Sequence, residues 1–157
     1  LLEKMGMENL IQDWLGQKQT VMPALSAAIV WFAVGFYVLI YLGGLSTVPE
    51  ELYEAAAVDG INWWQKLWRI TLPLIVQSVT INIIVSTIAI LTLFDLPYVL
   101  TQGGPGYASQ TMALMSYQYA FKAMSQGKAM AMAVMLTLIT VVFAVAELFV
   151  LNRKPSD

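Results

Sequence analysis

The chain of 157 residues contains no cysteine and no histidine, and only 11% of its residues are charged. The first two absences exclude disulfide bonds, thiolate nucleophiles, zinc sites with cysteine or histidine ligands, and acid–base catalysis by imidazole. Ordinary globular proteins carry roughly 25% charged residues, so the low charge excludes a water-soluble or disordered chain. The sequence therefore predicts neither an enzyme of the usual kinds nor a metal site.

Basic residues are also scarce. Eight lysines and arginines against ten aspartates and glutamates give a net charge of -2. This balance leaves no basic patch of the kind that a nucleic-acid backbone requires, so we expect no nucleic acid among the partners. No Walker A pattern (GxxxxGK[ST]) occurs in the sequence, which indicates that the chain does not bind ATP through a P-loop. We expect it to bind no cofactor.

Apolar residues, in contrast, make up 59% of the chain. A helix needs about 20 mostly apolar residues to cross roughly 30 Å of hydrocarbon, and three stretches reach or approach that length. We predict transmembrane helices over residues 24–45, 70–97 and 129–151. Too few polar residues remain to cover three such helices in water. The predicted fold class is therefore an all-α, polytopic transmembrane helical bundle with three spans.

The polar segments, residues 1–23, 46–69, 98–128 and 152–157, then alternate between the two sides of the membrane. The first twenty residues lack the features of a signal peptide, and we expect the chain to be the C-terminal part of a longer polypeptide. The positive-inside rule does not give the orientation, because each side carries four basic residues. These are Lys66, Arg69, Arg153 and Lys154 on one side, and Lys4, Lys18, Lys122 and Lys128 on the other.

Residues 46–69 have the pattern of a helix, a tight turn and a second helix. Thr47 and Glu50 have the spacing of a capping box, so we expect a helix from about residue 48 to residue 58. Gly60 can adopt the left-handed conformation that ends a helix.

An amphipathic helix is expected to follow, and Pro73 is expected in the first turn of the next span. The helix has apolar residues at a helical spacing, at Ile61, Trp64, Leu67 and Trp68. By physical chemistry alone, this segment is an interfacial amphipathic loop anchored by Trp63, Trp64 and Trp68.

A longer pattern in the same segment points to a family. Three residues separate Glu54-Ala55-Ala56 from Gly60, and nine more residues separate Gly60 from the pattern I-x-L-P at residues 70–73. This spacing resembles the EAA signature of permease subunits from binding-protein-dependent ABC importers. Residues 31–49 and 94–106 (FDLPYVLTQGGPG) are similar to flanking stretches of maltose and glycerol-phosphate type carbohydrate permeases, and the resemblance runs from about residue 24 to the C-terminus.

The resemblance implies a multi-pass permease subunit of the cell inner membrane, without catalytic activity of its own, that forms half of the path for a sugar or sugar-like solute. It implies as partners a second permease subunit, ABC ATP-binding subunits that use the ATP, an extracytoplasmic solute-binding protein and membrane lipid. It also places residues 46–69 and 152–157 in the cytoplasm and residues 1–23 and 98–128 outside.

The first helix of residues 46–69 would dock on the ATP-binding subunit and couple its movements to the spans. The residues to which the resemblance assigns this coupling are Glu50, Glu51, Glu54, Ala55, Ala56, Ala57, Asp59 and Gly60.

The second predicted span carries Ser78, Asn82 and Ser86 on one helix face. Such a stripe suits hydrogen bonding between helices, and it equally suits a wet translocation path; both interpretations stay open. Position relative to the two prolines of the motif implies path residues on this span and the preceding one. The candidate path comprises Ala33, Phe36, Asn82, Ser86, Ile90 and Leu93.

Two other functions stay open, namely an ABC permease for a non-sugar solute and a membrane anchor or assembly subunit without transport. An intramembrane hydrolase would need a nucleophile or a metal cluster within the spans. Asp95 and Glu147 are the only carboxylates near the spans, and they lie on different predicted helices without histidine support.

Overall fold

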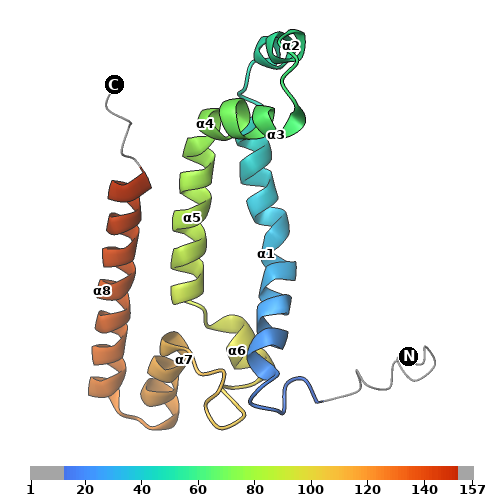
Figure 1. Cartoon of the computed structure of the whole chain (residues 1–157). Helices are drawn as coiled ribbons and strands as arrows, with labels where there is room; N and C mark the ends of the chain where they lie inside the picture. The colour runs from blue at the N-terminus through green and yellow to red at the C-terminus, as the bar shows by residue number, and fades with distance from the viewer. Residues whose placement is uncertain (1–12, 152–157) are drawn as a thin grey trace, which may run out of the picture. The chain divides into compact units, whose positions relative to one another are not determined.

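A computed structural model describes residues 13–151 of the chain (Figure 1). Every regular element within this range is a helix, so the predicted all-α class is confirmed. The predicted tail, residues 152–157, and the first twelve residues of the predicted segment 1–23 lie outside the described residues.

Three helical stretches are long and apolar enough to cross a membrane: Val21–Leu45, Val76–Leu100 and Gln126–Leu151. Hardly any of their residues are buried within the chain, and large side chains such as Trp31 and Phe32 are each 83% exposed. Exposed apolar surface on this scale is unfavourable in water and favourable against hydrocarbon. The chain therefore has the character of a multi-pass membrane protein.

The chain divides into two compact units. Of the described residues, one unit, which we call the EAA unit, contains 33–90 and 139–151, and the second unit contains 13–32 and 91–138. The EAA unit is built from the later part of α1 (Val21–Leu45), then α2 (Glu50–Val58), α3 (Trp63–Lys66), η3 (Leu67–Thr71), α4 (Leu72–Leu74), α5 (Val76–Leu91) and the later part of α8 (Gln126–Leu151). Figure 1 shows α2 beyond the end of α1, on the same side as α3 and α4.

The helix α1 begins at Val21, three residues before the predicted span. Pro23 lies in its first turn, where a missing N–H leaves no intrahelical hydrogen bond unmade. The N–H of Val21 donates to the carbonyl oxygen of Gln17 at 3.0 Å, so helical bonding is already established before the first apolar run.

The predicted capping box between Thr47 and Glu50 is wrong. The helix α2 begins at Glu50, with Pro49 at its N-cap position and no side-chain cap. The hydroxyl of Thr47 instead donates to the carbonyl oxygen of Gly44 at 2.8 Å. The N–H groups of Thr47 and Val48 also donate to the carbonyl oxygens of Gly44 and Leu45, each at 3.2 Å. Thr47 therefore belongs to the end of α1, whose last carbonyls need donors, and not to the N-cap position of α2.

The predicted span over residues 70–97 corresponds to the membrane-length stretch Val76–Leu100, and the structure separates its predicted first turn, which contains Pro73, from that stretch. Pro73 lies in the short helix α4, and Ile75 departs from helical geometry before α5 begins at Val76. The turn before the proline is π-helical, with the N–H of Leu72 bonded to the carbonyl oxygen of Leu67. A proline ring clashes with the carbonyl four residues earlier, and the wider turn η3 accommodates that clash.

The second unit contains the earlier parts of α1 and α8 together with α6 (Asp95–Leu100), α7 (Met112–Tyr117) and η4 (Gln118–Lys122). Its interior is small and includes Leu114 and Pro97, which are fully buried. The hydroxyl of Ser116 donates to the carbonyl oxygen of Ala129 at 2.9 Å, which ties α7 to the start of α8.

Candidate functional site

The helix α2 carries the predicted coupling residues, and most of them lie at the surface. Glu50, Glu51 and Glu54 are exposed, and the first two lie in the first turn, where negative charge is favoured by the helix dipole. The helix contains no basic residue. Its outer surface is therefore acidic and rich in small side chains, which suits close contact with a basic partner surface.

Ala56 differs from the other predicted coupling residues because it is only 3% exposed. Ala55, Ala57, Asp59 and Gly60 are all exposed. Ala56 therefore packs on its own chain in this structure, and a direct contact with a partner falls to its exposed neighbours. Val58, at the last position of the helix, is 88% exposed.

The end of α2 forms a complete Schellman motif around Gly60. Gly60 has a φ of +68°, which is costly for a residue with a Cβ atom and easy for glycine. The N–H of Ile61 donates to the carbonyl oxygen of Ala56 at 3.0 Å, and the N–H of Gly60 donates to that of Ala57 at 3.2 Å. The helix stop predicted at this position is confirmed.

A capping box that sequence reasoning missed starts the next helix. The Oδ1 of Asn62 accepts from the N–H of Gln65 at 2.9 Å, and the Oε1 of Gln65 accepts from the N–H of Asn62 at 3.2 Å. The signal was present in the sequence as Asn-x-x-Gln directly after a glycine stop. Together the two motifs fix the corner between α2 and α3.

A side-chain contact joins α2 to the turn η3. The hydroxyl oxygens of Tyr53 and Thr71 lie 3.0 Å apart, and the Nζ of Lys66 lies 5.9 Å from the centre of the Tyr53 ring. Thr71 is only 8% exposed. No local pattern predicts this contact, because the two hydroxyl groups are 18 residues apart in the chain.

The tryptophans of the predicted amphipathic helix all remain exposed. Trp63 and Trp64 lie in α3 and Trp68 in η3, and the rings of Trp63 and Trp64 meet edge to face with centres 4.8 Å apart. Indole rings with one polar edge suit the boundary between lipid and water. Anchoring of this segment at the membrane surface therefore remains compatible with its structure.

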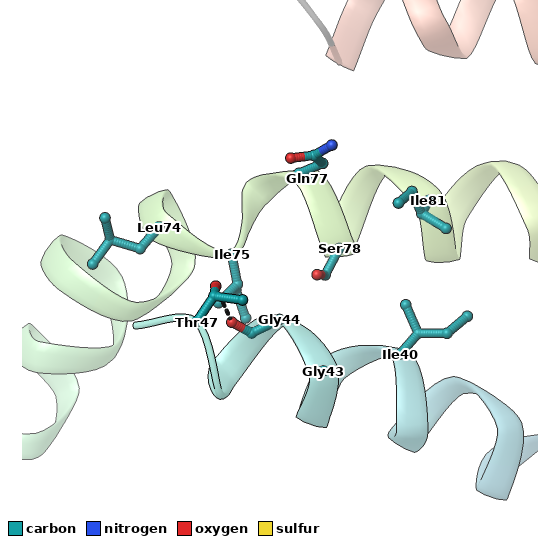
Figure 2. A pocket seen from close by; sticks show the side chains of 9 residues that line it. All are labelled: Ile40, Gly43, Gly44, Thr47, Leu74, Ile75, Gln77, Ser78 and Ile81. Atoms are coloured by element: carbon teal, nitrogen blue, oxygen red, sulfur yellow. Dashed lines mark hydrogen bonds between the residues drawn. The ribbon is translucent and has the colours of Figure 1, made fainter. Parts of the chain in front are cut away.

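The helices α1 and α5 approach closely near the ends that flank the EAA segment, and a shallow pocket of about 230 Å³ lies there. Figure 2 shows Ser78 pointing toward α1 and Gln77 pointing away from it. A Cβ atom added to Gly44 would lie 2.8 Å from the Cβ of Ser78, whereas one on Gly43 would meet nothing within 4 Å. The absence of a side chain at Gly44 therefore permits this contact between the two helices.

Two members of the predicted polar stripe bond in different ways. Asn82, only 3% exposed, donates through Nδ2 to the carbonyl oxygen of Tyr37 at 3.3 Å, and its buried Oδ1 has no hydrogen-bond partner. The hydroxyl of Ser86 donates within its own helix to the carbonyl oxygen of Ile83 at 2.9 Å. Asn82 thus forms an interhelical contact of the packing kind, while Ser86 makes none through its hydroxyl donor.

The remaining candidate path residues fall in both compact units. Phe36 is 55% exposed and its ring meets Tyr37 edge to face, Ala33 is half-buried, and Ile90 is exposed. Leu93 belongs to the second unit, whereas the other candidates belong to the EAA unit. Their role in a translocation path therefore stays a prediction.

A polar pair between α5 and α8 also escaped sequence reasoning. The Oγ1 of Thr87 donates to the Oε1 of Glu147 at 2.6 Å, across 60 residues of sequence. The other carboxyl oxygen, Oε2, is buried without a hydrogen-bond partner. Within residues 13–151, no group of three or more His, Cys, Asp and Glu side chains could hold a metal ion.

In the second unit, the loop after α6 is held by its own polar groups. The hydroxyl of Ser109 lies 2.7 Å from that of Thr101 and donates to the carbonyl oxygen of Gly104 at 2.6 Å. The loop therefore has a defined structure of its own.

Two tyrosines of the second unit also meet. The hydroxyl oxygens of Tyr98 and Tyr117 lie 3.5 Å apart, and hydrogen bonding to Tyr98 raises the pKa of Tyr117 above its ordinary value.

Comparison with known proteins gives a match over almost the whole chain. Residues 7–153 match the family described as binding-protein-dependent transport system inner membrane component. The match includes the EAA segment and all three long helices. It confirms the resemblance that the motif spacing indicated.

Three relatives with assigned solutes are similar to the chain. A sulfoquinovosyl glycerol transport system permease protein of Agrobacterium fabrum is 33% identical over 98% of the chain and 49% of the relative. A diacetylchitobiose uptake system permease protein of Streptomyces coelicolor is 40% identical over 89% of the chain and 40% of the relative. A trehalose/maltose transport system permease protein of Thermococcus litoralis is 39% identical over 68% of the chain and 36% of the relative. The chain thus spans half or less of the length of these relatives.

Proposed function

Because the chain belongs to the family of binding-protein-dependent transport system inner membrane components, we propose that it forms half of the translocation path of an ABC importer. In this proposal a separate ATP-binding subunit hydrolyses ATP, and α2 receives its movements. The observation that carries the proposal is the combination of an exposed acidic α2 with the EAA spacing from Glu54 to Pro73. The chain itself would be non-catalytic and would hold no cofactor.

Docking on the ATP-binding subunit would use the exposed face of α2. Glu54 offers a carboxylate to a basic residue of the partner, and the exposed Ala55 and Ala57 allow a close approach. Gly60 and the capping box at Asn62 would set the direction in which a displacement of α2 is passed on. Ala56, which is buried, would act by packing rather than by contact.

The sides of the membrane follow from this docking. The ATP-binding subunit works in the cytoplasm, so we place residues 46–69 and the tail 152–157 there. Residues 1–23 and 98–128 would then face the outside, where the ordered loop after α6 would meet an extracytoplasmic solute-binding protein. A second permease subunit would supply the other half of the path.

For the solute we propose a sugar or a compound that contains a sugar. The support is that three relatives carry names with sulfoquinovosyl glycerol, diacetylchitobiose and trehalose or maltose. The exposed ring of Phe36 suits stacking on a sugar face, and the hydroxyl of Ser86 suits a sugar hydroxyl. Asn82, Ala33, Ile90 and Leu93 complete the proposed path.

Uptake by cells that carry or lack the gene for the full-length protein tests the solute class. Labelled maltose, trehalose, diacetylchitobiose and sulfoquinovosyl glycerol are compared with glutamine and inorganic phosphate. We expect energy-dependent accumulation of a sugar-containing solute that disappears in the deletion strain. Accumulation of glutamine or phosphate alone would overturn the solute class, and no gene-dependent uptake of any probe would favour an anchor or assembly subunit.

A further inference from the structure

The contact between Tyr53 and Thr71 has a place in the proposed coupling. Chain connections join α2 to the rest of the EAA unit at residues 46–49 and 59–62. The hydroxyl contact of 3.0 Å adds a third connection, from the middle of α2 to the last residue of η3. Thr71 lies four residues before Ile75, where the direction of the chain changes into α5.

We infer that Tyr53 is a positioning residue, which makes α2 and the start of α5 move as one body when an ATP-binding subunit displaces α2. This inference rests on the proposed function for the displacement itself. It goes beyond the EAA signature because Tyr53 is not among the residues that the motif spacing assigns to coupling.

The surroundings of the contact suit a rigid connection. Thr71 is nine-tenths buried, and its hydroxyl also lies 3.4 Å from the carbonyl oxygen of Lys66, in the same helical segment. The ammonium group of Lys66 faces the ring of Tyr53. Water competes less for a part-buried hydrogen bond than for an exposed one. The Tyr53 side chain therefore has a contact at its hydroxyl, with Thr71, and a second at the face of its ring, with Lys66.

The alternative is that the two chain connections alone transmit movement. Gly60 and Asn62 form an ordered corner on one side, but Pro49 at the other end of α2 has no side-chain cap. Without the hydroxyl contact, α2 could pivot about the Gly60 corner while α5 stays in place. Movement of the partner would then be lost between α2 and the membrane helices.

The test measures the distance between spin labels at Val58→Cys and Gln77→Cys in the complex of the full-length protein with its ATP-binding subunits. Val58 is at the exposed end of α2, and Gln77 on α5 points away from α1 (Figure 2). These 157 residues contain no cysteine, and any cysteine elsewhere in the full-length protein or in the ATP-binding subunits is first replaced by serine. Co-purification of the ATP-binding subunits with the labelled protein is checked first.

With the native Tyr53, we expect a narrow distance distribution that is unchanged between the nucleotide-free and the vanadate-trapped states. Tyr53→Phe removes only the hydroxyl, and it should broaden the distribution and shift it on vanadate trapping. Thr71→Val should do the same, whereas Thr71→Ser, which keeps a hydroxyl, should restore the narrow distribution. The double variant Tyr53→Phe/Thr71→Val should be no broader than either single variant.

A distribution for Tyr53→Phe equal to that of the native protein in both states would overturn the inference. So would a native distribution that shifts on vanadate trapping, because α2 and α5 would then move separately. Failure of the proposed function is distinguishable, since no ATP-binding subunit would be recovered. In that case the distance distributions of the native protein and of Tyr53→Phe are compared in the permease alone. Equal widths of the two distributions would again overturn the inference.

Discussion

Gly44 of α1 and Ser78 of α5 lie so close that a Cβ atom at position 44 would be 2.8 Å from the Cβ of Ser78. Real Cβ atoms keep a larger separation, so this pair limits how near the two helices can come. Close approach through small residues is a common basis of helix association in membranes, because no hydrophobic driving force brings helices together in lipid. The neighbouring Gly43 meets nothing within 4 Å and offers an internal comparison.

We predict that Gly44→Ala destabilises the protein by about 1–2 kcal/mol, because overpacking outweighs the gain in helix propensity. Gly43→Ala should be neutral or slightly stabilising, since only the propensity changes. Thermal unfolding of both variants in the same detergent measures the difference. Equal melting temperatures for the two variants would show that α1 and α5 do not meet at Gly44.

The second prediction concerns the corner after α2. Gly60→Ala places a Cβ atom on a backbone with a φ of +68°, which costs about 1–2 kcal/mol. Hydrogen exchange at the last amides of α2 should accelerate about 5- to 30-fold, the ratio that this energy implies. Gly60→Asn should accelerate it less, because asparagine tolerates this conformation better. Unchanged exchange in both variants would contradict the assigned corner.

The third prediction separates packing from solute contact in the polar stripe. Asn82→Asp removes the donor that bonds the carbonyl oxygen of Tyr37 and introduces a carboxylate at a buried position. We expect a loss of about 2–3 kcal/mol at pH 7. Thermal unfolding of the variant and of the wild type in the same detergent measures the loss.

Ser86→Ala is the matched comparison for this experiment. The hydroxyl of Ser86 donates to the carbonyl oxygen of Ile83 in its own helix, so we expect its removal to leave the thermal stability unchanged. A change in uptake with unchanged stability would support Ser86 as a path residue. An unfolding temperature lowered as much as that of Asn82→Asp would assign Ser86 to packing instead.

The fourth prediction concerns Thr87 and Glu147. Thr87→Val removes the hydroxyl that donates to Oε1 of Glu147. Because Oε2 already has no hydrogen-bond partner, both carboxyl oxygens then lack one. A buried acceptor left without its donor costs about 1–3 kcal/mol, and we expect a loss near the lower end of this range in thermal unfolding. In a Glu147→Ala background the same change should cost less, since the acceptor is already gone. Equal costs in both backgrounds would show that the pair is not coupled.

The features that sequence predicted correctly are local in the chain. Three apolar runs are long enough to cross a membrane whatever their neighbours do, and Gly60 ends α2 because its own backbone freedom permits the turn. The spacing from Glu54 to Pro73 indicated the family for the same reason. Each of these features depends only on residues within one continuous segment of the chain.

The features that sequence missed depend on competition or on distance. Thr47 could have ended α1 or capped α2, and its N–H and its hydroxyl both bond the carbonyl oxygen of Gly44 at the end of α1, which leaves Pro49 at the N-cap position of α2. The pairs Tyr53 with Thr71 and Thr87 with Glu147 arise only when separate helices come together. One sequence carries no periodic signal for such pairs, so they required the structure.

The most direct test of coupling through α2 is affinity purification of the full-length protein from membranes in mild detergent, with co-purifying proteins identified by mass spectrometry. Wild type is compared with Glu54→Lys, which reverses a charge on the exposed face of α2, and with Lys122→Glu, a charge reversal on the exposed surface of η4. We expect a P-loop ATPase with wild type and with Lys122→Glu, and its loss or marked reduction with Glu54→Lys. Recovery of no ATPase in any sample, or equal recovery with Glu54→Lys, would contradict docking through α2.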